Sequence, residues 1–196
     1  MENNLSKSQG QKLLQLARTV IGKKLGLVDE VSTEGFEEKA FGQKLGTFVT
    51  IKIDNQLRGC IGNIEPSGTV VESVRRNAMS SAFSDHRFSP LAADEFSRIK
   101  IDISILSDPR KLEYTDGDEL LRLLVPGVHG VILSRGSARA TFLPQVWTQL
   151  PEPEQFLGHL CIKAGLPQSS WRDLHPDVFV YEVLHFEEDV HETGAE

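Results

Sequence analysis

The sequence contains little cysteine and no long apolar run. Two cysteines, Cys60 and Cys161, stand among 196 residues, which is too few for the disulfide framework of a small secreted domain. No apolar stretch approaches the roughly 18 residues that a membrane-spanning helix needs. The first ten residues, MENNLSKSQG, are polar and unlike a secretory signal peptide. We therefore expect a cytoplasmic protein without membrane association. We also expect both thiols to be free, although the sequence leaves a bridge between them open.

The sequence also lacks the common signatures of cofactor and metal sites. It has no Walker loop, no GxGxxG fingerprint and no Gly-x-Ser-x-Gly elbow. Its histidines do not form a His-Glu-x-x-His motif, and the two cysteines lie too far apart for a zinc ribbon. His159 and Cys161 fall in an expected helix, where residues two apart do not share a face. The sequence thus predicts no cofactor and no metal site.

An excess of positive charge is missing as well. The formal net charge is −7, which disfavours non-specific binding to nucleic acid, because that binding depends on neutralising phosphates. The composition, 39% apolar and 25% charged residues, is that of an ordinary globular protein. A chain of this length buries a sizeable core without disulfides or metal. We expect one domain over residues 1–196, with residues 192–196 as a loose tail.

Helical periodicity and capping signals predict several helices. Thr69 and Glu72 form a capping box, and Gly165 is a typical residue after a helix end. Ser89-Pro90 has the pattern of an N-cap followed by proline at the first helical position. The expected helices cover residues 9–25, 70–82, 115–124 and 153–164, with a short one from Ser89 to about Phe96.

Runs of β-branched and alternating apolar residues predict strands. They fall at 47–53, from Leu57, at 99–105, 130–135 and 138–143, and over 177–188. Several of them follow each other through short turns such as Asp54-Asn55 and Gly136-Ser137. This order favours an α+β fold, with a mostly antiparallel sheet and flanking helices, over a doubly wound parallel one.

The hexapeptide LRGCIG, residues 57–62, concentrates an arginine, two glycines and a cysteine. A helix is expected to begin just after Thr69, and helix N-termini carry unpaired N–H groups and partial positive charge. A thiolate is favoured near such an end. Arg58 could bind a carboxylate or a phosphate. The motif therefore fits a site for a nucleophile or an anion around Cys60.

The glycines of this motif allow two interpretations. Without a side chain, Gly59 and Gly62 would let the backbone approach a ligand closely, and we treat both as candidate ligand contacts. The alternative is that the segment serves packing and that Cys60 is a small buried apolar residue, as most unpaired cysteines are.

Three other segments contain candidate site residues. SDHRFSP holds Asp85, His86 and Arg87, which either form a polar wall of the same cleft or pair with each other and cap a turn. His129, between glycines, titrates near neutrality and could act as acid or base, or it could be structural. Gln145 could donate a hydrogen bond to a ligand or cap the following helix.

The segments GTFVTI, LRGCIG, DHRFSP, GVHGVIL, TFLPQVW and FLGHLCIKAGL occur here in one order. Together they resemble the AMMECR domain family, whose bacterial members are called AmmeMemoRadiSam system protein A. The resemblance covers nearly the whole chain, from the first helix to the strand near residue 186. The hallmark LRGCIG is unaltered.

The resemblance implies an α+β fold with a larger lobe that contains both termini, a smaller lobe and an antiparallel sheet. It also implies that the hallmark lines a cleft between the lobes, with Arg58, Cys60 and the two glycines as its floor. Such proteins often accompany a Memo-like protein, similar to non-haem dioxygenases, and a radical SAM protein. These two are the expected partners. No reaction follows from the resemblance.

Two functions from different classes stay open. In an enzyme, Cys60 would be a nucleophile or acid/base, His129 or Asp85 its partner, and Arg58 or Arg87 an anion clamp. In a binding or adaptor module, the cleft would hold a small anion, a peptide or a partner protein without chemistry. The absence of any recognised catalytic spacing motivates the second hypothesis.

Overall fold

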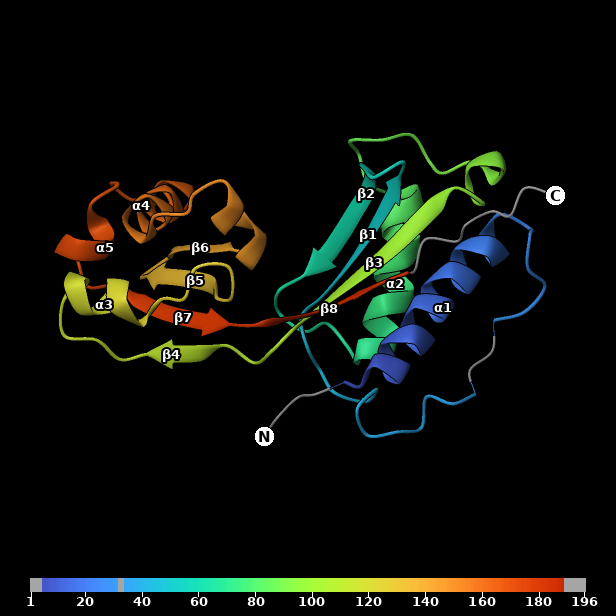
Figure 1. Ribbon diagram of the computed structural model, residues 1–196, viewed down its shortest axis with the longest axis horizontal. Coiled ribbons are helices and arrows are strands. Elements are labelled where there is room, and N and C mark those ends of the chain that lie inside the picture. The colour runs from blue at the N-terminus through green and yellow to red at the C-terminus, as the bar shows by residue number, and fades with distance from the viewer. Residues whose placement is uncertain (1–4, 32–33, 189–196) are drawn as a thin grey trace. The chain divides into compact units, whose positions relative to one another are not determined.

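The computed structural model describes residues 5–31 and 34–188; the expected tail at 192–196 lies outside them. The chain forms two compact units. Unit 1 contains the described residues up to Leu106 and from Leu184 to Glu188, and unit 2 is Ser107–Val183 (Figure 1). Each unit has its own hydrophobic core. None of the helices in residues 5–31 and 34–188 combines the length and the apolar character that a membrane span requires.

Unit 1 is a four-stranded sheet with two long helices. The strands lie in the order β2-β1-β3-β8, so β2 is an edge strand, and β1 pairs antiparallel with both β2 and β3. The elements are α1 (Lys7–Lys24), β1 (Thr47–Ile53), β2 (Gln56–Asn63), α2 (Val70–Phe83), the short 3₁₀ helix η1 (Ala93–Glu95), β3 (Ile99–Leu106) and β8 (Val183–Glu187).

Helices α1 and α2 cover one face of this sheet. Their apolar residues share one buried core with Val49 and Ile51 of β1 and with four alternating isoleucines of β3, Ile99, Ile101, Ile103 and Ile105. Figure 1 shows the two helices alongside the sheet. Because side chains alternate between the faces of a strand, the intervening residues of β1 and β3 point to the face without helices.

Unit 2 is a second four-stranded antiparallel sheet, in the order β4-β7-β5-β6. Its core contains both tryptophans, Trp147 and Trp171. The elements are β4 (Arg110–Leu112), α3 (Gly117–Leu123), β5 (Gly130–Arg135), β6 (Ala138–Phe142), the 3₁₀ helix η2 (Pro144–Thr148), α4 (Pro153–Lys163), α5 (Ser170–Asp173) and β7 (Asp177–Tyr181).

The predicted α+β class is confirmed, and local signals located the ends of the four main helices to within two residues. Helix α1 begins at Lys7, after its N-cap Ser6 and two residues before the expected start. Thr69 and Glu72 form the expected capping box of α2. Gly165 follows α4 with φ +78°, the left-handed conformation that favours glycine.

Two expected elements are wrong. Ser89-Pro90 does not begin a helix, because the only helical residues between α2 and β3 are Ala93–Glu95, which follow Ala92 as N-cap. The single strand expected over 177–188 is two strands, β7 and β8, which belong to different sheets. Sequence patterns also missed β4, η2 and α5, each of which has five residues or fewer.

Candidate functional site

Cys60 lies in the middle of β2, directly opposite Thr50 of β1. The Thr50 hydroxyl donates a hydrogen bond to the Cys60 sulfur at 3.3 Å. Both side chains point to the face without helices, and Cys60 is partly exposed. The thiol is therefore not the small core residue that the packing interpretation assumed.

The sequence predicted a helix N-terminus beside Cys60, and this prediction is wrong. The part of α2 that reaches this segment is its C-terminal end, because the hydroxyl of Ser81 accepts the Ile61 N–H at 2.8 Å. The N-cap Thr69 lies at the opposite end of the 14-residue helix. The partial charge at a helix C-terminus is negative. Any positive charge at the thiol must come from side chains.

Asp85 and Arg87 hold both main-chain groups of Cys60 at the outer edge of the sheet. One Asp85 oxygen, Oδ2, accepts the Cys60 N–H at 2.9 Å, and Arg87 Nη2 donates to the Cys60 carbonyl at 3.2 Å. Arg87 also donates to Asp85 through Nε at 2.9 Å and Nη2 at 2.7 Å. Asp85 and Arg87 therefore bind the backbone of Cys60 on the side of β2 that pairs with no other strand.

The charges of this cluster are fixed near neutral pH. The Arg87 guanidinium, together with two backbone N–H donors, holds the pKa of Asp85 well below its usual range. The Asp85 carboxylate in turn raises the pKa of Arg87. A carboxylate with so low a pKa is a poor proton acceptor. The contacts of Asp85 suit positioning rather than proton transfer.

Arg58 is the unpaired residue of a β-bulge. Ile51 pairs with Gly59 and Lys52 pairs with Leu57, so Arg58 has no partner on β1. Its guanidinium instead donates to both carboxylate oxygens of Glu95, at 2.8 and 2.9 Å, and to the Ser89 carbonyl at 2.9 Å. Arg58 therefore ties the segment between α2 and β3 to the edge of β2. Its role as an anion clamp stays a prediction.

The space beside each glycine of the motif is filled by the protein itself. A Cβ on Gly59 would lie 2.1 Å from the Ser81 carbonyl oxygen, and one on Gly62 would lie 2.3 Å from the ring of Phe48. The first glycine lets α2 approach β2, and the second lets an aromatic ring lie over the strand. These contacts describe packing, and the predicted ligand contacts of both glycines stay predictions.

A charged group on the same face was not singled out from the sequence. Asp102 of β3 lies opposite Thr50, so Cys60, Thr50 and Asp102 form one row across three strands. The Asp102 side chain is only 7% exposed. It accepts from Lys52 Nζ at 2.8 Å and lies 3.1 Å from Nε2 of His185. Only the register reveals this row, since its members are far apart in the sequence.

His129 and Gln145 belong to unit 2, whereas Cys60, Asp85 and Arg87 belong to unit 1. His129 is buried; its Nδ1 accepts the Val125 N–H at 3.1 Å, and its carbonyl accepts Trp147 Nε1 at 2.7 Å. Burial lowers the pKa of His129, as does the charge of Arg110. Gln145 is exposed in η2. The roles predicted for both stay predictions.

Other features of unit 1 do not extend the site. No three histidine, cysteine, aspartate or glutamate side chains gather as metal ligands within residues 5–31 and 34–188. A pocket of about 410 Å³ lies between α1 and the following loop, lined by residues such as Lys12, Leu16, Val31 and Phe36. It does not include the LRGCIG strand.

Comparison with known proteins identifies the family. The AMMECR1 family model matches residues 14–186. The chain belongs to the AMMECR1 family. A protein of Nanoarchaeum equitans is 37% identical over 90% of this chain and 99% of its own length. One of Methanopyrus kandleri is 37% identical over 96% of this chain and 93% of its own.

A solved structure shares the AMMECR1 fold seen here. An uncharacterized protein from Pyrococcus horikoshii, known from its crystal structure, superposes with a TM-score of 0.79 at 31% sequence identity, over 94% of each chain. The names of these relatives state no activity. The function of this AMMECR1 member therefore has to be argued from its own residues.

Proposed function

We propose that this AMMECR1 protein is a thiol-dependent enzyme in which Cys60 is the nucleophile. The observation that carries this proposal is the way the protein holds one partly exposed cysteine. Asp85 and Arg87 bind its N–H and its carbonyl, and the Thr50 hydroxyl donates to its sulfur. The first two contacts fix the backbone of Cys60, and the third acts on the thiol itself. Fixed geometry of this kind is what a nucleophile requires.

The surroundings of Cys60 suit attack on an electrophilic carbon. Phe48 lies over Gly62 next to Cys60 on the sheet face and offers an apolar surface. Arg87 supplies positive charge at the strand edge. In the proposed mechanism Asp85 is a positioning residue.

Alkylation by iodoacetamide, followed residue by residue with mass spectrometry, tests the nucleophile. We expect Cys60 in the native protein to react faster than the thiol of glutathione, while Cys161, which is 0% exposed, stays unmodified until the chain unfolds. Thr50→Val keeps the side-chain shape and removes the hydroxyl. It should slow Cys60 several-fold, whereas Ser104→Ala on the same sheet should not. A Cys60 no faster than glutathione would exclude the nucleophile and leave a binding module.

A variant of Cys60 serves as the control in a screen for substrates. Cys60→Ser should abolish any turnover found with the wild-type protein. Turnover that survives Cys60→Ser would contradict the proposed mechanism even if Cys60 is reactive.

We further propose that the enzyme works in the cytoplasm with a Memo-like protein and a radical SAM protein. The family resemblance supports this part of the proposal. Purification of the tagged protein at its native level should recover one or both partners. Recovery of the protein without either of them, under conditions where substrate is turned over, would count against an obligatory complex.

A further inference from the structure

The ion pair beside Cys60 is asymmetric in its exposure. The Asp85 side chain is 2% exposed, whereas that of Arg87 is 46% exposed. The negative partner is therefore buried beneath the surface, and the positive partner forms that surface. Nε and Nη2 of Arg87 are used by Asp85 and by the Cys60 carbonyl. Nη1 has no hydrogen-bond partner among the described residues, so it keeps its donors for another group.

The guanidinium is held in a fixed orientation close to the thiol. The bidentate contact with Asp85 fixes its plane, and the ring of Phe88 lies 5.5 Å from it. Arg87 Nη2 is 3.2 Å from the Cys60 carbonyl oxygen. Covalent geometry places the sulfur of a cysteine within about 5 Å of its own carbonyl oxygen. The sulfur therefore lies within about 8 Å of Arg87 Nη2, so one small molecule can extend from the sulfur to the guanidinium.

We propose that Arg87 binds an anionic group, a carboxylate or a phosphate, on the molecule that reacts at Cys60. This inference rests on the proposed role of Cys60 as a nucleophile and names the class of its substrate. Asp85 orients the guanidinium before the substrate arrives, so that little ordering is needed on binding. The net charge of −7 gives the protein no general attraction for anions, so any such preference must be local.

Two reagents that differ in charge test this inference without knowledge of the natural substrate. Iodoacetate and iodoacetamide both alkylate a thiolate: a sulfur–carbon bond forms, the carbon–iodine bond breaks, iodide leaves, and the thiol proton passes to the buffer. Only iodoacetate is an anion. We expect the ratio of its rate to that of iodoacetamide to be about tenfold higher at Cys60 than at glutathione. Added salt should lower the ratio.

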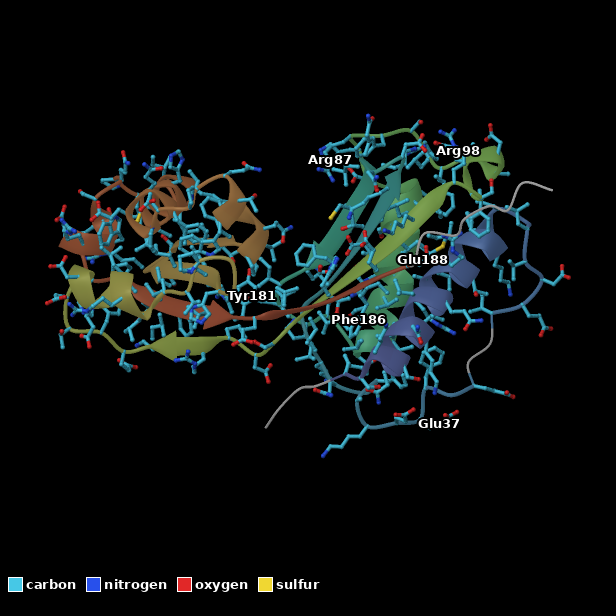
Figure 2. The ribbon with its side chains drawn as sticks, in the orientation of Figure 1. Glu37, Arg87, Arg98, Tyr181, Phe186 and Glu188 are labelled. Carbon is cyan, nitrogen blue, oxygen red and sulfur yellow. The ribbon has the colours of Figure 1, made fainter. Side chains whose placement is uncertain are left out.

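Arg87→Gln removes the charge and the free donors. We expect it to bring the rate ratio down to that of glutathione, and we expect Arg87→Lys, which keeps the charge, to retain part of the preference. Arg98→Gln is the matched control, because Arg98 is an exposed arginine on the same segment, paired with Asp54. Figure 2 shows Arg87 and Arg98 at separate positions of unit 1. Arg98→Gln should leave the ratio unchanged.

Competition distinguishes the two anion classes. Inorganic phosphate that slows iodoacetate but not iodoacetamide would support a phosphate group on the substrate, and acetate acting in this way would support a carboxylate.

An equal loss of both rates in Arg87→Gln would show that Arg87 only positions Cys60, and would overturn the inference. A Cys60 that reacts rapidly with iodoacetamide but has the rate ratio of glutathione would overturn it as well. That second result would leave the proposed role of Cys60 as a nucleophile intact. A slow reaction of Cys60 with iodoacetamide would instead contradict the proposed nucleophile.

Discussion

Asp85 shows how one residue can connect the strand edge with the candidate site. Its carboxylate is buried and accepts hydrogen bonds from the Cys60 N–H and from Arg87. Buried carboxylates need such partners, because an unpaired charge loses its hydration without compensation. The contacts lower the pKa of Asp85. Since the folded protein binds the Asp85 proton more weakly than the unfolded chain does, this residue stabilises the fold only while it is ionised.

We predict that Asp85→Asn lowers the free energy of unfolding at pH 7 by about 1 to 3 kcal/mol, because charge-assisted hydrogen bonds are lost. The depressed pKa sets the sign of the pH dependence. The wild-type advantage is complete above the unfolded pKa of about 3.9 and declines as the pH falls below it. Urea unfolding from pH 7 to pH 2 should therefore show the two proteins converging in acid.

The control for this series is Asp94→Asn, since Asp94 is an exposed carboxylate on the same segment. It should follow the wild-type protein at every pH within about 0.5 kcal/mol. A difference between Asp85→Asn and wild type that stays constant down to pH 2 would show that the stabilisation does not come from the ionised carboxylate.

At the scale of elements, the approach of α2 to β2 decides what the motif glycines do. The Ser81 hydroxyl donates to the Val49 carbonyl at 2.7 Å and accepts the Ile61 N–H, so the helix is bonded to two neighbouring strands. This arrangement brings the Ser81 carbonyl to the position where a side chain on Gly59 would begin. The strand needs a glycine there because the obstacle is backbone, which cannot move without shifting the helix.

We predict that Gly59→Ala destabilises the protein by at least about 2 kcal/mol, because the added methyl group would lie 2.1 Å from the Ser81 carbonyl oxygen. Gly42→Ala is the matched control in the same unit, since its nearest heavy atom would be 3.6 Å away. Chemical unfolding followed by far-UV circular dichroism measures both. If both substitutions change stability equally, the close approach of α2 and β2 is not what requires Gly59.

Helices and strands marked by residues close together in the sequence could be predicted from it. The capping box at Thr69 and Glu72 is formed by residues three apart, and the isoleucines of β3 alternate without interruption. The alternation of apolar residues over 177–188 wrongly predicted a single strand. It continues while the chain passes from one sheet to the other near Glu182. No local pattern records a change of sheet.

The candidate site was predictable only in part, because its geometry comes from pairings between distant segments. Residue type marked Cys60, Asp85 and Arg87 as chemically interesting. Their contacts depend on where α2 ends, and the sequence pattern suggested the wrong end of that helix. Thr50 and Asp102 are ordinary strand residues by sequence, and only the register of β1 brings them into line with Cys60.

At the scale of the whole molecule, the two units differ in how the chain builds them. Unit 1 needs two separate stretches of sequence, whereas unit 2 is one continuous segment, Ser107–Val183. The ends of that segment meet, because the Ser107 N–H donates to the Glu182 carbonyl at 2.9 Å and the Glu182 N–H donates to the Ser107 hydroxyl at 3.0 Å. A segment with adjacent ends and its own core has what it needs to fold alone.

We predict that a fragment of residues 107–183 folds by itself, and tryptophan fluorescence can report it because both tryptophans lie in this unit. Trp147 is buried, stacks on Phe156 with ring centroids 3.7 Å apart, and donates Nε1–H to the His129 carbonyl. The fragment should therefore keep the emission maximum of the full chain and unfold cooperatively. Phe156→Ala removes the stacked ring and should cost about 3 to 5 kcal/mol in the fragment. Emission at the wavelength of exposed tryptophan, without an unfolding transition, would mean that unit 2 depends on unit 1 for its fold.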